Sequence, residues 1–458
     1  MSGVGKMPFS LDSAADLFKI KYGERSEAAY NAANILLGRI RNKNDFGGEE
    51  RVHTNPLGFA GGIGSGELPS ARSRTNRKSR YGTKKVYARA YIEREAIYAS
   101  KNMGAFVDSL REVAEETVEA HARHMSVDLY NRSSGVIGRG DGATAPKYQT
   151  YTEATDALAD TASSGKTASD YIKVKIDSTP SRTYQGFVEA WFEEGDVHNL
   201  VIGNASSKTN RFEVFRVLPD SNEVVYKVEE GSSFGTGSGQ LGKLATDGTA
   251  MPKTTGFCFQ NSFNKEPVGL EEAIFGTGSL YGIPRQRRWQ ALVIDARSGG
   301  NTTGIDHEVL NELVTKQAQR KSLGNMIVTS YVQTKRLKDL SEGGSNDLKR
   351  YNIAGRKREG ISDKLQQKIS FSGTSYISEK GEIPIFADRF CPPDRLYFLN
   401  DSQIWCDKRP GAGWFMDDGT RFLRVQDQDA YEARYGVYCE NYIKPTWHAA
   451  LHGLTTSY

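Results

Sequence analysis

The sequence predicts an α+β fold with more than one domain, and three regions of the chain lead to this prediction. Residues 104–131 carry the pattern of a long amphipathic helix. Residues 170–265 consist of short alternating runs broken by turns, which is typical of strands. From Gly269 onward, strand and helix patterns follow each other. Because 458 residues are more than one hydrophobic core usually holds, we expect two or three domains.

The composition is that of a globular protein, with 38% hydrophobic and 25% charged residues. No apolar run reaches the ~18 residues that a membrane span needs, so no membrane partner is expected. The first ten residues, "MSGVGKMPFS", lack the charged-then-apolar pattern of a secretion signal. Four dispersed cysteines form no CxxC pair, which argues against a zinc ribbon and favours free thiols: Cys258, Cys391, Cys406 and Cys439.

The N-terminal segment predicts two short helices. Over residues 11–22 the apolar side chains fall on one helical side, and Asp12 or Ser13 can cap the start. A second helical pattern covers residues 26–40. We expect these helices to form an N-terminal arm over residues 1–47.

A glycine-rich stretch from Gly61 to Gly66 has the G-x-x-x-x-G spacing of a phosphate-binding loop. The next residues are Glu67 and Leu68, where such a loop needs Lys and Ser or Thr, and a carboxylate there would repel phosphate. No buried strand precedes the stretch and no helix pattern follows it. We therefore expect a long loop here and not an NTPase site.

Strand patterns at residues 50–58 and 80–92 flank this loop and predict a long, open β-arm. A two-stranded arm is not stable alone, so we expect it to pack on something, and a neighbouring subunit is the obvious candidate. Between residues 71 and 90 the arm has eight basic residues and no acidic one: Arg72, Arg74, Arg77, Lys78, Arg80, Lys84, Lys85 and Arg89. This run could contact nucleic acid or an acidic protein surface, or could simply face solvent.

The helix over residues 104–131 would be about 40 Å long. Its apolar residues recur at three- and four-residue steps, and several glutamates share the outer side. His121 and His124 lie three residues apart and could begin a metal site, but no third ligand is close in the sequence. We expect both to pack in a core or an interface, and we predict no metal site.

The remaining chain predicts a small β-rich domain followed by an α/β region. The run "RFEVFRVLPDSNEVVYKVE" is a hairpin pattern with its turn at Pro219–Asn222. After it, "WQALVIDA" predicts a buried strand, and residues 306–321 predict a helix capped by Asp306. The C-terminal "EARYGVYCENYIKP" predicts an aromatic strand.

The sequence contains no nucleophile elbow, dinucleotide fingerprint, kinase signature or metal-ligand pair. We therefore predict that the protein is not an enzyme, has no catalytic residue and needs no cofactor. An unrecognised enzyme stays open as an alternative, because catalytic residues need not be adjacent in sequence.

The order of these elements resembles the major capsid protein of tailed bacteriophages, the Hong Kong ninety-seven type fold. The phrases "ELPSA" and "VYARAYIEREAIYAS" look like an extended E-loop running into a peripheral domain, and "AFVDSLREVAEETVEAHARHMSVDLYN" looks like its spine helix. "GLEEAIFGTGSLYGIPRQRRW" resembles the start of the axial domain. "CPPDRLYFLN" and "YEARYGVYCENYIKP" resemble that domain's end and the C-terminal strand.

The resemblance implies a domain order that covers most of the chain. The expected parts are an N-terminal arm (1–47), an E-loop (48–92), a peripheral domain (93–165) with its spine helix (104–131), an inserted β-rich domain (166–267), an axial domain (268–415), and a return strand with the C-terminal tail (416–458).

The resemblance also implies a function. Copies of the chain would form hexamers and pentamers that tile an icosahedral shell around double-stranded DNA, without sequence-specific binding. The shell would be assembled in the host bacterial cytoplasm and become the virion capsid. A scaffolding protein, a portal protein and a decoration protein are the implied partners. An encapsulin-like shell and a basic nucleic-acid-binding protein are the alternatives.

In such a shell the β-arm would reach over a neighbouring subunit. Basic side chains of the arm could then meet acidic side chains of the neighbour's long helix. The residues expected in this contact are Arg72, Arg74, Arg77, Lys78, Arg80, Lys84 and Lys85 on one side, and Glu112, Glu115 and Glu116 on the other.

Overall fold

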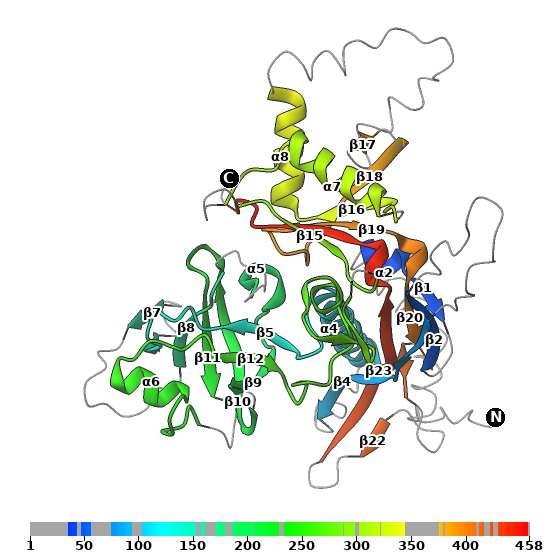
Figure 1. Cartoon of the computed structure of the whole chain (residues 1–458). Coiled ribbons are helices and arrows are strands. Elements are labelled where there is room, and N and C mark those ends of the chain that lie inside the picture. Colours follow the sequence, from blue (N-terminus) through cyan, green and yellow to red (C-terminus); the bar gives the residue numbers. More distant parts are fainter. Residues whose placement is uncertain are drawn as a thin grey trace, which may run out of the picture. The chain divides into compact units, whose positions relative to one another are not determined.

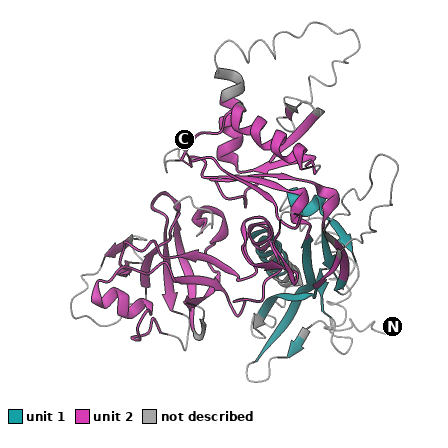
Figure 2. Cartoon of the chain, viewed as in Figure 1, with its two compact units in different colours: residues 1–48, 81–127, 405–442 teal, residues 49–80, 128–404, 443–458 magenta. Residues whose placement is uncertain are grey.

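The computed structural model describes most of the chain in two compact units. The described residues are 35–43, 47–55, 75–93, 103–152, 157–160, 171–178, 186–203, 205–228, 233–286, 288–297, 302–320, 322–343, 375–378, 381–408, 412–415, 422–424 and 429–456. The expected helix over residues 11–22 and the glycine-rich loop lie outside them. One unit comprises residues 1–48, 81–127 and 405–442, and the other comprises residues 49–80, 128–404 and 443–458 (Figure 2).

A six-stranded sheet forms the centre of the first unit. Its main path runs β1-β20-β23-β21, and β22 and β4 also pair with β23. The strands are β1 (Arg41–Lys43), β4 (Lys84–Glu93), β20 (Ile404–Lys408), β21 (Gly413–Trp414), β22 (Phe422–Arg424) and β23 (Ala430–Ile443). A short helix, α2 (Ile35–Arg39), precedes β1. The sheet therefore joins three parts of the chain that are far apart in sequence.

The long helix α4 (Met103–Tyr130) packs its apolar side on this sheet. Ala114, Val118, Ala122 and Met125 of the helix are buried, at the three- and four-residue steps of one helical side. The Met125 sulfur lies 3.8 Å from the Cys439 sulfur on β23. The helix begins and ends one residue before the expected 104–131.

Strands β2 (Gly48–Asn55) and β3 (Thr75–Tyr81) form a separate two-stranded sheet. The pattern at residues 80–92 was expected to be the second strand of the arm. Instead β3 ends at Tyr81, and residues 84–93 are β4, which pairs with β23 over ten residues. Gly82 and Thr83 separate the two strands. The sequence pattern at residues 80–92, which was expected to be one strand, therefore contributes to two different sheets.

The second unit contains an eight-stranded sheet in the order β5-β12-β9-β10-β11-β8-β6-β7 (Figure 1). Its strands are β5 (Val136–Arg139), β6 (Lys147–Thr152), β7 (Ala157–Asp160), β8 (Tyr171–Lys175), β9 (Val197–Ile202), β10 (Ala205–Leu218), β11 (Glu223–Val228) and β12 (Thr255–Phe259). Helices α5 (Val188–Trp191) and α6 (Leu241–Asp247) and a 3-10 turn, η2 (Pro219–Ser221), interrupt the strands. The sheet starts thirty residues before the expected domain at 166–267, and the region is not purely β.

Stacked aromatic rings fill the core of this sheet. The rings of Tyr226 and Phe257 have centroids 4.5 Å apart, and those of Phe212 and Phe234 are 5.4 Å apart. The predicted hairpin is confirmed, since β10 and β11 pair antiparallel up to Leu218 and Glu223. Asn222 closes the turn in the left-handed conformation, at φ 54°, which Asn adopts more readily than most residues.

A mixed six-stranded sheet in the order β15-β24-β19-β16-β18-β17 completes the second unit. Its strands are β15 (Leu292–Asp295), β16 (Met326–Thr329), β17 (Ser375–Ser378), β18 (Gly381–Ala387), β19 (Leu396–Leu399) and β24 (Ala449–His452). Helices α7 (His307–Gln319) and α8 (Tyr331–Gly343) accompany it, and Leu310, Leu313 and Phe398 belong to its core. The last described strand of the chain, β24, thus joins this sheet, in the part of residues 416–458 that was expected to be the C-terminal tail.

The short elements that remain are β13 (Ser279–Leu280), β14 (Ile283–Pro284), a π-helical turn η3 (Glu271–Phe275), and the 3-10 turns η4 (Asp401–Gln403) and η5 (Pro445–Trp447). None of the described helices is long and apolar enough to cross a membrane.

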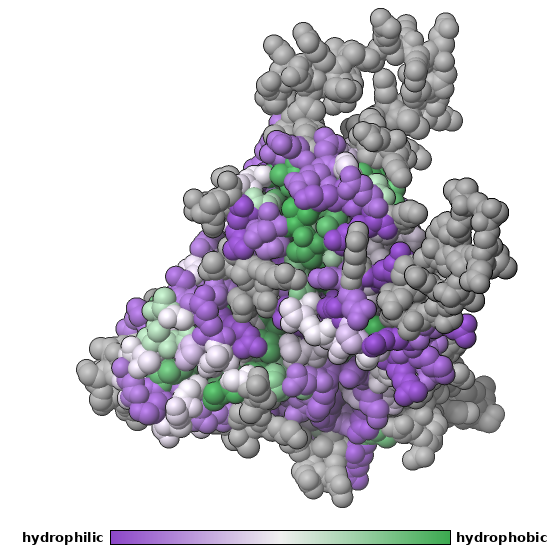
Figure 3. All heavy atoms as spheres, in the orientation of Figure 1, coloured by the Kyte–Doolittle hydropathy of each residue, from purple (hydrophilic) through white to green (hydrophobic). Residues whose placement is uncertain are grey.

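Hydrophilic residues cover much of the described surface on the face drawn in Figure 3. Among the described residues, the exposed large hydrophobic side chains are Ile35, Tyr87, Tyr91 and Tyr331. Two of these four, Tyr87 and Tyr91, lie on β4, so this strand presents aromatic rings to solvent.

Candidate functional site

The β2–β3 arm carries three of the predicted contact residues. Arg77, Lys78 and Arg80 are exposed on β3, whereas Ser79 between them is buried. The Ser79 hydroxyl donates to the Glu50 carbonyl at 3.0 Å, which ties β3 to β2. Alternation along β3 places Lys78 and Arg80 on the face opposite Ser79, whereas Arg77 is exposed on the same face as Ser79. Arg72 and Arg74 lie outside the described residues.

Glu49 on β2 holds two of these basic groups. The Lys78 Nζ and Arg80 Nε atoms donate to its carboxylate at 2.9 and 2.8 Å. The hydrogen bond and charge of Lys78, with those of Arg80, lower the pKa of Glu49. Because all three side chains are exposed to solvent, these ion pairs add little to stability. They also reduce the positive charge that the arm presents.

Lys84 and Lys85 are placed on a different sheet from the arm. They start β4, where Lys84 faces Cys439 and Lys85 faces Tyr438 of β23. The Lys85 ammonium group lies 5.7 Å from the centre of the Tyr438 ring. Tyr87, Tyr438 and Phe415 form an aromatic cluster with ring centroids 5.6 to 6.2 Å apart. Burial and a hydrogen bond with Tyr438 raise the pKa of Tyr87 to about 12.

The outer side of α4 carries the predicted acidic partners. Glu115 and Glu116 are exposed, and the side chain of Glu112 lies outside the described residues. On the inner side, the His121 ring meets the edge of the Tyr435 ring at 5.0 Å, and burial lowers the pKa of His121 to about 3. His121 is therefore a neutral core residue, as the sequence predicted.

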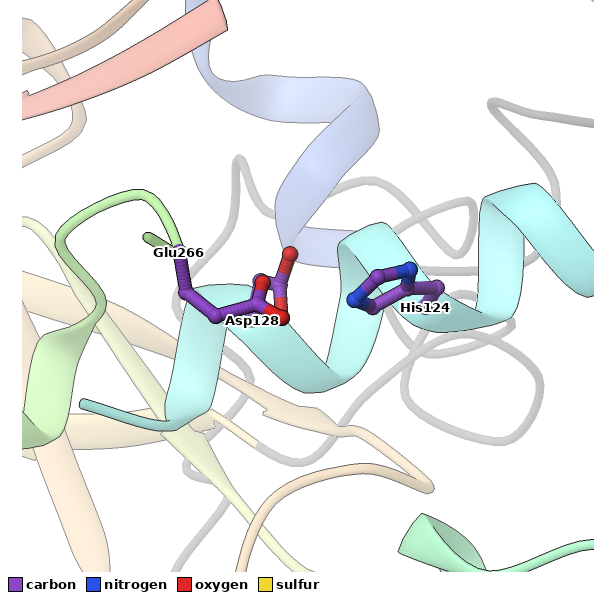
Figure 4. Close-up of side chains that lie close together, drawn as sticks. All are labelled: His124, Asp128 and Glu266. Atoms are coloured by element: carbon purple, nitrogen blue, oxygen red, sulfur yellow. The ribbon is translucent and has the colours of Figure 1, made fainter. Parts of the chain in front are cut away.

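Two carboxylates of the second unit lie close together, Asp128 at the C-terminal end of α4 and Glu266 (Figure 4). Both residues are buried, and one carboxylate oxygen of each lies within 4.8 Å of the other. On the same helix, His124 precedes Asp128 by one turn. Divalent cations accept oxygen donors of this kind.

Sequence reasoning missed this pair of carboxylates because Glu266 is more than 130 residues from the helix. The helical spacing of His124 and Asp128 was a usable signal, since i and i+4 share one face. The absence of a metal site therefore stays a prediction.

A buried charge network lies in the second unit and was also missed. Arg395 and Asp394 are fully buried and Glu271 nearly so, and the Arg395 guanidinium reaches the Glu271 carboxylate at 3.2 Å. The same guanidinium lies 4.1 Å from the centre of the Phe275 ring. Burial raises the pKa of Asp394 to about 6, although the Arg395 charge opposes the shift. The network lies in the interior, so its geometry fits a structural role better than a catalytic one.

The chain is similar over most of its length to capsid proteins of known structure. A chain of the cyanophage A-1(L) capsid asymmetric unit is 12% identical, with a TM-score of 0.46, and the match covers 92% of this chain and 91% of that one. A capsid chain of the native GTA particle is 8% identical, with a TM-score of 0.41 and coverage of 93% and 91%. The holo-SrpI encapsulin of Synechococcus elongatus is 10% identical, with a TM-score of 0.22 and coverage of 36% and 54%.

No protein-family model and no curated protein matches the sequence.

Proposed function

We propose that the chain is the major capsid protein of a tailed bacteriophage. In this role it would assemble through hexamers and pentamers into an icosahedral shell that encloses double-stranded DNA. The virion capsid is its proposed location, after assembly in the host bacterial cytoplasm. Scaffolding, portal and decoration proteins are its proposed partners, and no enzymatic activity is needed for the role.

One observation carries the proposal: in the sheet of the first unit, the late strand β23 pairs with the early strand β4. Ten residues of β4 pair with β23, from Glu93 and Ala430 to Lys84 and Cys439. The long helix α4 packs on the same sheet through His121 and Met125. This pairing supports the proposal, because the resemblance implies a return strand next to the spine helix in the peripheral domain.

The β2–β3 arm supports the proposal for a second reason. A two-stranded sheet is marginally stable alone, and the described arm holds exposed charges on β3. In a shell, a neighbouring subunit would cover the exposed side of such an arm. The proposed contact joins arm residues such as Arg77 to the acidic outer side of a neighbour's α4, where Glu115 and Glu116 are exposed.

Sedimentation and negative-stain microscopy test the proposal. The protein would be expressed alone and with the products of its neighbouring genes. We expect closed shells, or capsomers that close into shells when a scaffolding protein is added. A stable monomer or dimer under every condition would contradict the proposal.

The same preparations separate the capsid from its alternatives. A nucleic-acid-binding protein would bind DNA as a small oligomer, with an affinity that falls steeply with salt. An encapsulin-like shell would contain packaged enzyme and no DNA.

A further inference from the structure

A tyrosine has the left-handed backbone conformation at the tip of a short hairpin in the second unit. Strands β13 and β14 pair through Leu280 and Ile283, which leaves Tyr281 and Gly282 as a two-residue turn. Their φ angles are 51° and 78°. Hairpin turns with positive φ at both positions favour Asn, Asp or Gly at the first one. Among the described residues, four other than glycine have positive φ, and the three besides Tyr281 are asparagines.

This conformation is costly for a large side chain, because the Cβ atom crowds the following carbonyl oxygen. Such a residue keeps the conformation only where the surrounding structure holds it there. The turn alone therefore does not account for a tyrosine at this position.

Two distant segments donate hydrogen bonds to Tyr281. Its hydroxyl oxygen accepts from the Ile443 N–H at 3.2 Å, and its carbonyl oxygen accepts from the Arg80 N–H, also at 3.2 Å. Arg80 is the penultimate residue of β3, and Ile443 is the last residue of β23. All three residues belong to the second unit. One residue thus connects the end of the arm's second strand with the end of β23.

Both hydrogen bonds depend on the same backbone torsion. Rotation about the N–Cα bond of Tyr281 moves its side chain and its carbonyl group together relative to β13. If φ relaxed to a negative value, the hydroxyl and the carbonyl oxygen would therefore both leave their donors. The two bonds and the strained torsion form one coupled unit.

We propose that Tyr281 is a strained latch at the root of the β2–β3 arm, in which the hydroxyl bond to Ile443 holds the backbone conformation that keeps Arg80 bound. When the hydroxyl bond breaks, the backbone relaxes and the Arg80 N–H is released, so the end of β3 is no longer fixed to the hairpin. The inference does not depend on the proposed function, because a single chain contains every contact.

The hairpin itself is the other possible cause of the conformation. Leu280 and Ile283 are buried, and the Trp289 Nε1–H donates to the Leu280 carbonyl at 3.2 Å. If these contacts alone fixed the turn, loss of the hydroxyl would release Ile443 and leave Arg80 bound. The two explanations therefore differ in what they predict for the Arg80 amide.

Hydrogen exchange resolved to single amides tests the proposal on the full chain. Mass spectrometry with electron-transfer fragmentation would compare the parent protein with Tyr281→Phe, which lacks only the hydroxyl. In the parent protein we expect the amides of Arg80 and Ile443 to be protected. In Tyr281→Phe both should exchange roughly five- to tenfold faster, as the loss of one hydrogen bond predicts.

Tyr281→Asn separates the hydroxyl from the strain. Asparagine adopts positive φ readily, but its side chain is too short to replace the tyrosine hydroxyl. The Ile443 amide should therefore exchange faster, as in Tyr281→Phe, whereas the Arg80 amide should stay as protected as in the parent protein. Tyr331→Phe makes the same change at an exposed tyrosine of α8 and should alter neither amide. Circular dichroism and urea unfolding would confirm that each variant folds.

An Arg80 amide that stays protected in Tyr281→Phe would overturn the proposal, since the hairpin would then fix the turn alone. Equal exchange of Arg80 in Tyr281→Asn and Tyr281→Phe would overturn it too, because the strain would have no part in the release. An Ile443 amide that exchanges freely in the parent protein would show that the hydroxyl bond does not form, which would also overturn it.

Discussion

Arg89 on β4 stands directly opposite Arg434 on β23. The Glu432 carboxylate, which is only 8% exposed, pairs with both arginines and so screens two like charges that face each other. Burial opposes the ionised form of Glu432, but the hydrogen bonds from Arg434 and Arg89 outweigh it and lower its pKa. One acidic side chain therefore offsets the like charges at this point of the junction between β4 and β23.

Replacing Glu432 by Gln should destabilise the protein by about 1 to 2 kcal/mol, because Arg89 and Arg434 would then repel each other without a counter-charge. Equilibrium unfolding in urea would measure the change. Glu116→Gln, on the exposed side of α4, is the matched control and should change stability by less than about 0.5 kcal/mol. In the double variant Arg89→Gln/Glu432→Gln, part of the loss should be recovered. Strictly additive losses would show that the two residues are not coupled.

The buried side chain of Asp394 predicts that the stability of the protein falls, and does not rise, as the pH increases above 3.8. Its pKa is raised from 3.8 to about 6 in the folded protein. Between these two pH values the carboxyl group is protonated in the native state and ionised in the unfolded chain. This contribution to stability is present below pH 3.8 and is lost as the pH rises through about 6.

Asp394→Asn should therefore gain stability relative to the parent protein between pH 4 and pH 7, by on the order of 1 to 3 kcal/mol. Urea unfolding at a series of pH values would measure it. Asp220→Asn, at an exposed turn, should leave the pH profile unchanged. A difference between parent and Asp394→Asn that is constant with pH would contradict the assignment.

Charge reversal in the arm should impair assembly and leave the fold intact. The double variant Arg77→Glu/Lys78→Glu places acidic groups where the proposed contact has basic ones, which should lower the yield of sedimenting particles about tenfold. Circular dichroism and unfolding would confirm that the subunit still folds. Lys265→Glu, an exposed reversal in the second unit, should assemble normally. Normal shells from the arm variant would show that these residues do not mediate assembly.

Local patterns predicted the individual elements well. The helix pattern from Phe106 to Leu129 lies within α4. Asp306 caps α7 as expected, since its carboxylate accepts from the Val309 N–H at 2.8 Å. The β10–β11 hairpin follows from turn residues that lie between two alternating runs. In each case the deciding interactions span only a few residues.

Pairings between distant segments could not be predicted in the same way. Alternation shows which face of a strand is buried, but it does not name the partner strand. The residues from Lys84 onward were therefore assigned to the arm, although their partner begins at Ala430. The pair of Asp128 with Glu266 and the pair of Arg395 with Glu271 were missed for the same reason. The placement of the contact residues between subunits stays a prediction.

Cryo-electron microscopy of particles assembled from the protein would test the central claim most directly. We expect an icosahedral shell of hexamers and pentamers, in which the β2–β3 arm of one subunit lies against α4 of its neighbour. Particles without icosahedral symmetry, or a shell in which the arm folds back on its own subunit, would contradict the account.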